Sequence, residues 1–409
     1  MLFINFFSII TMKFRSTLMK KRILLTYIES GMGHITSIKS ISDALNKLND
    51  GSFELIDSYI MQEDKNPTLI KFNNFIIHQT QQTNKIKGYG AFVFTILEIL
   101  GKQKFMVGIH HTLFRKALNE ALKSIDKYKP DVIVSTHYFM TLCAIEYKKR
   151  YNKNCIVVTY NPDNNIHTWW DNRDGLFIVN NPEAYKEAIE RRHFNPDEVK
   201  QVYFTARDEI ISAHQDKKLY RQKHNIPQDK FCVIIADGAY ASAKSKDVCN
   251  ELLKTDLPIT IIMLAGKNEK VYNYFKEKEP HTKPNITLIT SGFTLEAYEL
   301  YCASDVFITK AGPNAILDSV FMNTPIIVDY YAHPIEKATT KLFVDKFKCG
   351  LAIYKPKKIR KKIEEFIKNP ELLIPYIENC KKIDKNQNGA EDVAKYIIEE
   401  IRKSDEKGN

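Results

Sequence analysis

Several signatures that would assign a sequence to a simple class are missing from these 409 residues. The seven cysteines form no C-x-x-C pair, and the 11 histidines form no H-E-x-x-H motif. An odd number of scattered cysteines is typical of small buried side chains in a reducing compartment, rather than of a disulfide framework or a zinc site. We therefore expect no metal ion and no other cofactor.

Long apolar runs are also missing. Residues 2–10 and 91–100 are mostly apolar, but both stretches are shorter than the roughly 20 residues of a membrane-spanning helix. The first stretch lacks the basic n-region and the small-residue cleavage site of a signal peptide. Residues 1–20 form a leader with two open interpretations: an amphipathic anchor, or a segment that is not translated because synthesis starts at Met19 rather than Met1.

Acidic residues are nearly absent from residues 65–116. This window has eight Lys or Arg and a single acid, Glu98, and seven aromatic residues lie among them. Basic residues mixed with apolar ones fit an anionic membrane surface, where apolar side chains insert and Lys or Arg contact the headgroups. The alternative is a core helix beneath a solvated basic face. The side chains predicted to face the membrane are Lys85, Lys87, Phe92, Phe94, Lys102 and Lys104.

A strand, a glycine turn and a helix open the first half of the chain. Residues 22–28 are predicted to form a buried strand, and E-S-G-M-G-H follows at residues 29–34. The apolar positions 38, 41, 45 and 48 then lie on one face of a helix. Side chains at such a turn face the ligand crevice at the carboxyl ends of parallel strands. His34 is accordingly either a catalytic residue or a helix cap.

The stretch V-F-I-T-K-A-G-P-N-A-I-L-D at residues 306–318 repeats this pattern in the second half. It is predicted to be a buried strand, a small-residue turn and a short helix. Glycine and proline let backbone N–H groups approach a ligand closely, and the helix N-terminus adds partial positive charge, which makes an anion site. Asp318 lies one helical turn beyond Asn314, where a carboxylate can bridge ribose hydroxyls. A nucleotide diphosphate site and an ordinary βαβ crossover both fit this pattern.

The order of several short motifs favours the nucleotide diphosphate site over an ordinary βαβ crossover. S-G-F-T-L-E at residues 291–296, I-T-K-A-G-P at 308–313, T-P-I-I-V at 324–328 and Glu336 resemble the donor-binding half of the glycosyltransferases that make monogalactosyl- and glucosyl-diacylglycerol. Their G-x-G-H turn is similar to residues 31–34. The peptidoglycan-precursor N-acetylglucosaminyltransferases are more distant relatives. The resemblance implies an α/β protein with the GT-B fold, in which two Rossmann-like domains face each other across a cleft.

Chain length agrees with two domains, because 409 residues exceed one ordinary domain. We expect an acceptor- and membrane-binding domain at residues 21–205, a connection at 206–229 and a UDP-sugar-binding domain at 230–388. A C-terminal helix and tail follow at 389–409. In two-domain transferases of this shape the last helix often crosses back to the first domain, and the tail after Lys403 is expected to be disordered.

The resemblance implies a role for each matching donor-side residue. His34 is the proposed catalytic base. Phe293 and Thr294 lie against the nucleotide base, Asp318 holds the ribose, and Glu336 contacts the sugar. The residues expected at the diphosphate are Gly238, Lys310, Ala311, Gly312, Pro313 and Asn314.

The donor side departs from the family pattern at three places. The usual ribose glutamate is Asp318, the usual Gln-Glu pair is Ile335-Glu336, and the usual glycine-rich turn keeps only Gly238. The first change shortens the reach of the carboxylate, and the second removes one partner for the sugar hydroxyls.

The acceptor side departs as well. The family's V-V-T-D…H-x-x-W segment corresponds to residues 157–170, but Tyr160 stands in place of the aspartate, so either Asn161 or Asp163 is left to substitute for it. The residues expected to line the acceptor side of the cleft are Gly31, Gly33, Asn161, Asp163, His167 and Trp169.

The predicted function is transfer of a hexose, glucose or galactose, from a UDP-sugar to diacylglycerol or a glycolipid, with inversion. The enzyme would be peripheral to the cytoplasmic face of the cell membrane. No nucleic-acid module is recognisable, so no nucleic-acid partner is expected. The alternatives are a transferase with a polyprenyl diphosphate acceptor, a UDP-sugar epimerase, and a membrane protein that binds UDP-sugar without turnover.

Overall fold

The computed structural model describes residues 20–29, 32–85, 103–171, 173–330 and 334–408. Most of the predicted leader lies outside these ranges. Of the residues assigned to the cleft and the membrane face, Gly31, Lys87, Phe92, Phe94 and Lys102 also lie outside them.

The first domain is built on a six-stranded parallel sheet of order β2-β1-β3-β4-β5-β6. Its strands are short and rich in Ile and Val, as expected for strands that are buried on both faces. They are β1 (Lys21–Thr26), β2 (Phe53–Asp57), β3 (Val132–Ser135), β4 (Ile156–Asn161), β5 (Leu176–Val179) and β6 (Val199–Gln201).

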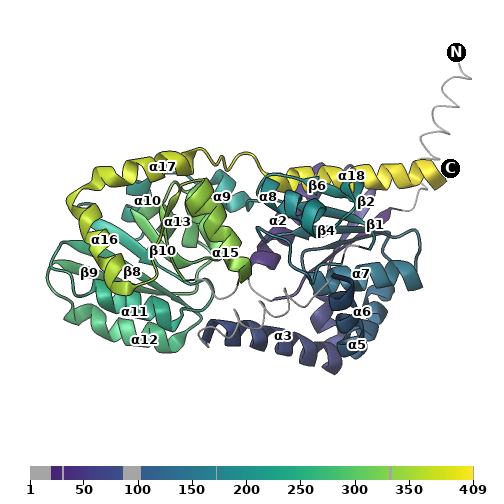
Figure 1. Ribbon diagram of the computed structural model, residues 1–409, viewed down its shortest axis with the longest axis horizontal. Helices are drawn as coiled ribbons and strands as arrows, with labels where there is room; N and C mark the ends of the chain where they lie inside the picture. The colour runs from purple at the N-terminus through teal and green to yellow at the C-terminus, as the bar shows by residue number, and fades with distance from the viewer. Residues whose placement is uncertain (1–19, 30–31, 86–102, 172, 331–333, 409) are drawn as a thin grey trace, which may run out of the picture.

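Helices cover both faces of this sheet (Figure 1). One apolar cluster joins the sheet to α2 (Met32–Leu48), and the other joins it to α3 (Pro67–Lys85), α6 (Arg115–Tyr128) and α7 (Tyr138–Arg150). The remaining helical segments are η1 (Ile60–Lys65), α5 (Gln103–Leu113), α8 (Pro182–Lys186), η2 (Glu187–Arg191) and η3 (Pro196–Glu198).

The second domain has a parallel sheet of order β12-β11-β10-β7-β8-β9. The chain runs outward from β7 in one direction and from β10 in the other, so the switch point, where ligands bind in such sheets, lies between these two strands. The strands are β7 (Phe231–Ile235), β8 (Ile259–Gly266), β9 (Ile286–Gly292), β10 (Val306–Lys310), β11 (Ile326–Tyr330) and β12 (Gly350–Ala352).

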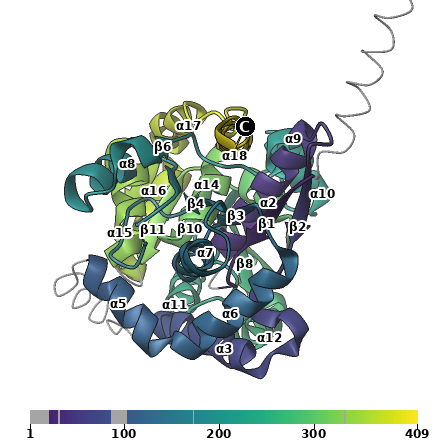
Figure 2. The same cartoon turned by 90° about the vertical axis from the view of Figure 1, so that its right-hand side faces the viewer.

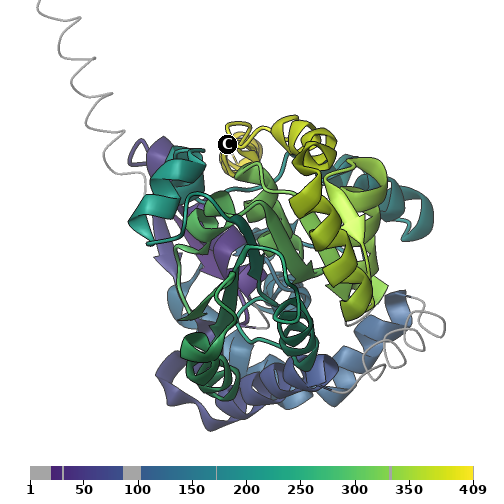
Figure 3. The ribbon, with the colours of Figure 1, turned by 90° about the vertical axis from the view of Figure 1, so that its left-hand side faces the viewer.

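Helices again cover both faces of the second sheet, as Figure 3 shows from the side of this domain. They are α11 (Ala243–Leu252), α12 (Glu269–Lys278), η4 (Glu279–His281), α13 (Ala297–Ala303), α14 (Pro313–Phe321), α15 (Pro334–Thr340), η5 (Lys341–Lys346), α16 (Pro356–Lys368), η6 (Pro370–Leu373) and α17 (Ile374–Lys381).

The segment predicted to connect the domains is folded against the second one. It contains α9 (Asp208–Ser212) and α10 (Lys217–Lys223), and Ile210 and Tyr220 are buried in the core of the second domain. Arg221 donates to Ala303 O (2.8 Å) and forms an ion pair with Asp305 (2.8 Å). The segment is thus a part of the second domain's core rather than an open connection.

The chain crosses between the domains twice, and the two crossings lie together. Gly389 N donates to Phe204 O (3.0 Å), and Ala206 N donates to the side chain of Asn388 (3.1 Å). A Cβ on Gly389 would lie 1.9 Å from Tyr203 O. Only glycine therefore fits at the point where the two connecting segments touch.

The last helix, α18 (Gly389–Gly408), crosses back to the first domain, as expected (Figure 1). Val393, Ala394 and Ile397 are fully buried in the cluster that contains α2 and β1. The expected disorder after Lys403 is wrong for residues 404–408, because the helix continues there and Asp405 forms an ion pair with Lys21 (2.8 Å).

Candidate active site

The donor turn lies at the switch point of the second sheet. Lys310 N donates to Asp237 Oδ1 (3.1 Å), which ties the end of β10 to the residues that follow β7. Ala311 N donates to Tyr330 O (2.8 Å), and Gly312 N donates to Lys310 O (2.7 Å). These two N–H groups are used inside the protein, so they are not the free phosphate donors that the sequence suggested.

The free donors of this turn lie slightly further on. Pro313 is the first residue of α14 and has no N–H, whereas the next two N–H groups, of Asn314 and Ala315, have no partner within the described part of the chain. The first N–H groups of a helix point away from its body, where they bind anions. The residues of α14 with free N–H groups, where a phosphate is expected, are therefore its second and third.

Lys310 and Glu336 form an ion pair beside this turn. The distance between Lys310 Nζ and Glu336 Oε1 is 2.9 Å, and both side chains are largely buried. Burial opposes the positive charge, but the neighbouring Glu336 carboxylate outweighs it and raises the pKa of Lys310. A fixed ammonium group thus lies next to the diphosphate turn, and its partner is the residue expected at the sugar.

Asp318, the carboxylate expected at the ribose, is held by a residue that the sequence motifs did not reveal. Arg207 Nη2 donates to Asp318 Oδ2 (3.0 Å), and Arg207 Nη1 is 3.4 Å from Leu295 O. Burial raises the pKa of Asp318 even though the guanidinium favours its ionised form. Arg207 belongs to no motif, and only the path of the 206–229 segment along the second domain places it here.

The expected nucleotide-base residues lie on the adjoining loop. The Phe293 ring is exposed and has the Lys267 ammonium 5.0 Å from its centroid, and Thr294 Oγ1 accepts from Glu296 N (3.0 Å). Gly238 has a φ of +74°, and nothing lies within 4 Å of a Cβ placed there. The backbone at Gly238 is therefore open to a ligand.

His34 lies in the first turn of α2. Its Nδ1 is 2.5 Å from Thr136 O, and the Thr136 hydroxyl donates to His34 O (3.0 Å). Because a carbonyl oxygen only accepts, Nδ1 carries the ring proton and Nε2 keeps its lone pair. Burial lowers the pKa of His34 to about 4, against a smaller opposite effect of the Thr136 hydrogen bond. The ring is neutral near pH 7 and able to accept a proton.

The base and the donor turn meet across the cleft. Asn314 Nδ2 donates to Thr36 Oγ1 (2.6 Å) and lies 3.4 Å from Gly33 O. A Cβ on Gly33 would be 3.5 Å from the Asn314 amide. The turn that carries His34 is thus in direct contact with the N-terminal end of α14, where a phosphate is expected.

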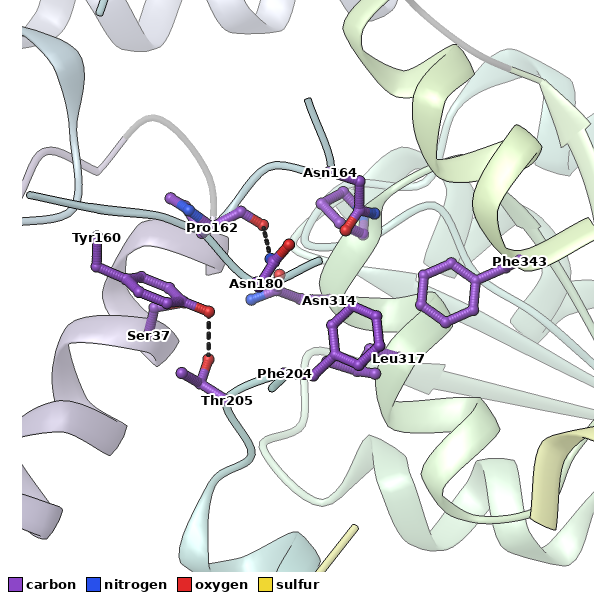
Figure 4. A pocket seen from close by; sticks show the side chains of 11 residues that line it. Ser37, Tyr160, Pro162, Asn164, Asn180, Phe204, Thr205, Asn314, Leu317 and Phe343 are labelled. Carbon is purple, nitrogen blue, oxygen red and sulfur yellow. Dashed lines mark hydrogen bonds between the residues drawn. The ribbon is translucent and has the colours of Figure 1, made fainter. Parts of the chain in front are cut away.

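A small pocket lies beside this contact, between the two domains (Figure 4). Asn314 and Leu317 enter it from α14, and Ser37 enters it from α2. On the first-domain side, Tyr160 forms a hydrogen bond with Thr205 (3.2 Å). Tyr160, which stands in place of the family's aspartate, is therefore buried beside this pocket.

The residues expected to replace that aspartate have different positions. Asn161 is buried and holds its own loop, since it donates to Asn165 O (2.8 Å) and accepts from Asp163 N (3.0 Å). Asp163 is 3.8 Å from His167 and within electrostatic range of Glu336 on the opposite domain. Burial, followed by Glu336, raises the pKa of Asp163 to about 7. Of the two candidates, only Asp163 faces the donor domain.

A cluster of aromatic rings and histidines continues from His34 into the first domain. The ring centroids of His34 and His137 are 4.9 Å apart, and Tyr138 follows at 4.2 Å from His137. Tyr138 contacts Trp169 (5.0 Å) and His110 (5.4 Å). His110 lies on α5, so this cluster links the proposed base to the basic, aromatic window.

The described part of that window has both buried and exposed aromatic and aliphatic residues. Phe72 lies in the core with α6, whereas Phe105 and Leu113 on α5 are 58% and 70% exposed. Figure 2 shows α3, α5 and α6 together along the lower edge of this domain. The backbones of Lys85 and Lys104 lie in α3 and α5, but their side chains are outside the described residues.

Two features are absent from the residues that the structure describes. Within them, no helix is long and apolar enough to cross a membrane. In the same part of the chain, no three His, Cys, Asp or Glu side chains gather as a metal site.

Comparison with known proteins agrees with this geometry. The monogalactosyldiacylglycerol (MGDG) synthase family model matches residues 34–202. The chain is 23% identical over 385 residues to a processive diacylglycerol beta-glucosyltransferase of Bacillus licheniformis, with 93% of this chain and 95% of the relative covered.

Solved structures agree on the fold. MurG of Acinetobacter baumannii superposes with a TM-score of 0.60 at 14% identity, and it covers 93% of this chain and 99% of MurG. Anabaena Alr3699/HepE in complex with UDP-glucose gives 0.55 at 12% identity, with 93% and 99% covered.

The fold and the site define the class of this protein: it is a glycosyltransferase with the GT-B fold, a UDP-sugar-dependent hexosyltransferase. Within that class the chain is similar to the MGDG synthases and the processive diacylglycerol β-glucosyltransferases, in agreement with the resemblance of its motifs.

Proposed function

We propose that this enzyme transfers glucose or galactose from a UDP-sugar to the hydroxyl of diacylglycerol, with inversion, at an anionic membrane surface. The relatives named above for diacylglycerol support the acceptor. The observation that carries the chemistry is the contact between the two halves of the site. The His34 turn touches the phosphate-binding end of α14 through Asn314.

His34 is the proposed base. Its Nε2 accepts the proton as the acceptor oxygen attacks the anomeric carbon, and the Thr136 carbonyl fixes the ring in the tautomer that this step needs. The imidazolium that forms keeps its Nδ1–H bond to Thr136 O. A single displacement of this kind inverts the configuration at the anomeric carbon.

The donor side stabilises the leaving group. As the bond between the anomeric carbon and the phosphate oxygen breaks, negative charge develops on UDP. The free N–H groups of Asn314 and Ala315, together with the Lys310 ammonium, are the donors that this charge meets. Arg207 holds Asp318 in place for the ribose hydroxyls, and Phe293 offers its exposed ring to the base.

The first domain takes the lipid in this proposal. The exposed Phe105 and Leu113 on α5 support insertion at a bilayer surface, and the ring cluster from His110 to His34 leads from that helix to the base. Basic residues of the 65–116 window contact anionic headgroups. The proposal places the enzyme at the cytoplasmic face of the membrane.

The test uses purified protein, radiolabelled UDP-glucose or UDP-galactose, and diacylglycerol in anionic vesicles. We expect labelled glycolipid from one or both donors. His34→Gln removes the base, so the turnover rate should fall by about 10²- to 10⁴-fold while UDP binding changes little. A His34→Gln variant with wild-type turnover would exclude His34 as the base.

Other outcomes of this assay point to the rival functions. Product with a polyprenyl diphosphate but not with diacylglycerol would assign the other acceptor class. Conversion of the UDP-sugar without lipid would indicate an epimerase. UDP binding without any turnover would leave a non-catalytic binding protein.

A further inference from the structure

His137 is a buried histidine beside the proposed base, and the mechanism above leaves it without a task. It lies between β3 and α7, and its ring centroid is 4.9 Å from that of His34. The residue before it, Thr136, holds His34 through two hydrogen bonds. One turn of the chain therefore positions both imidazole rings.

The start of α7 fixes the tautomer of His137. Phe139 N donates to His137 Nδ1 (3.2 Å), so Nδ1 presents its lone pair. Burial, followed by the neighbouring His34, lowers the pKa of His137 well below its ordinary value, so the ring is neutral near pH 7. A neutral imidazole has one ring proton, and here that proton is on Nε2.

This Nε2–H group has no protein partner. His137 is 1% exposed, and within the described residues no atom accepts a hydrogen bond from its Nε2. Nε2 is also not one of the fully enclosed polar atoms that lack a partner in this part of the chain, so it borders open space. A donor in a buried side chain is costly to leave unpaired, so this one is expected to meet a ligand.

Helix capping does not explain why this residue is a histidine. The cap of α7 needs only an atom that accepts from Phe139 N, and Asn, Asp or Ser are the residues that usually provide it. What histidine adds is a second nitrogen, which carries the unpaired N–H beside His34.

The two rings offer opposite groups side by side. Thr136 O accepts from His34 Nδ1, which leaves a lone pair on His34 Nε2, whereas His137 Nε2 offers a proton. Such a pair matches a molecule that has a hydroxyl and a second oxygen on neighbouring carbons. In diacylglycerol, the carbon next to the free hydroxyl group's carbon bears an ester, whose carbonyl oxygen accepts hydrogen bonds.

We propose that His137 binds the acceptor lipid by donating its Nε2–H to the ester carbonyl oxygen beside the attacked hydroxyl. This hydrogen bond orients the glycerol so that the hydroxyl meets His34 Nε2. The inference rests on the proposed function, and it names the chemical group, an ester next to a hydroxyl, by which the first domain selects its acceptor.

The experiment compares two variants that each keep one nitrogen position of the ring. His137→Asn has an acceptor at the place of Nδ1 and still caps α7, but it has no group at the place of Nε2. His137→Gln has a donor at the place of Nε2 and lacks the cap. The readouts are kcat/KM with 1,2-diacylglycerol and with 1,2-dialkylglycerol, in which ethers replace the esters, and UDP affinity by calorimetry.

With diacylglycerol, His137→Asn should lower kcat/KM by about tenfold, because the hydrogen bond to the carbonyl oxygen is lost. His137→Gln should recover most of that loss. Dialkylglycerol has no carbonyl, so the wild type should use it less well, and His137→Asn should lower its kcat/KM little further. UDP affinity should be the same in all three proteins, and urea denaturation checks that both variants fold.

Three results would overturn the inference. In the first, His137→Asn uses diacylglycerol as well as the wild type does. In the second, His137→Gln loses more activity than His137→Asn, as a purely capping role requires. In the third, His137→Asn loses the same factor with both lipids, so the lost contact is not with the ester carbonyl.

None of these three results counts against the proposed function, because the wild type makes glycolipid in each of them. A wild type that makes no glycolipid from diacylglycerol, with either UDP-glucose or UDP-galactose, contradicts the proposed function and the inference together.

Discussion

At the scale of single residues, the site works by fixing protonation and orientation through backbone groups. Thr136 O decides which nitrogen of His34 carries the proton. The N–H groups of Ala311 and Gly312 are used inside the protein, which leaves those of Asn314 and Ala315 for the proposed phosphate contact. These choices depend on single hydrogen bonds, so they are sensitive to conservative substitutions.

Arg207→Met should weaken UDP binding by about tenfold or more, because Asp318 is then left without its charged partner in a largely buried position. Calorimetric titration with UDP measures the change. The control is Arg360→Met, since Arg360 forms comparable ion pairs with Glu251 and Glu364 on the outer face of the second domain. Equal UDP affinity of Arg207→Met and the wild type would show that Arg207 does not support the ribose site.

At the scale of elements, helices of the first domain serve two different tasks. The helix α2 brings His34 to the cleft and packs its apolar face, including Ile38 and Ile41, on the sheet. The helix α5 instead leaves large apolar side chains in solvent at one end of the domain. An apolar surface of this kind beside basic residues is typical of membrane contact.

Replacing Phe105 and Leu113 together by Asp should reduce binding to anionic vesicles by about tenfold or more, because the variant loses two inserted side chains and gains repulsion from the headgroups. Vesicle sedimentation measures the bound fraction. Ile374→Asp on α17, a residue that is 55% exposed, is the control for an added surface charge. If the double variant sediments like the wild type, α5 is not a membrane contact.

At the scale of the whole molecule, the two domains are joined by more than the crossing at Phe204 and Gly389. Asn164 donates to Thr339 (3.1 Å), Lys346 pairs with Glu183, and Asn314 reaches Thr36. All of these contacts lie along the cleft. The first domain also depends on the helix α18, because side chains from this last helix complete the core of that domain.

Ile397→Ala should lower the free energy of unfolding by about 3 kcal/mol, because it leaves a cavity between α18 and α2 in the first-domain core. Urea denaturation followed by circular dichroism measures the loss. Lys395→Gln, an exposed change on the same helix, should have an effect within about 0.5 kcal/mol. A loss of the same small size for Ile397→Ala would mean that α18 does not stabilise the first domain.

The free energy of unfolding should also fall as the pH falls from 6.5 toward 4. Burial, followed by the adjacent His111, lowers the pKa of His110 from 6.5 to about 4, so the folded chain keeps this ring neutral where the unfolded chain protonates it. The unfolded state then binds more protons, which costs the fold up to about 3 kcal/mol at this residue. His110→Phe should flatten the pH dependence of unfolding, and an unchanged profile would contradict the prediction.

Much of the fold and half of the site follow from local patterns. The strands β3, β4 and β10 are β-branched runs, and the turns at His34 and Gly312 are marked in the sequence by glycines between a strand pattern and a helix pattern. The same local patterns support the GT-B fold and the kind of donor, since strand, turn and helix lie within a few residues of one another.

The tertiary structure alone decided what depends on residues that are distant in the sequence. It placed Arg207 on Asp318, put Asp163 rather than Asn161 toward the donor domain, and folded the supposed connection into the second core. These contacts join positions 82 to 111 residues apart or on separate domains, where strand order and packing, rather than neighbouring residues, set which side chains meet.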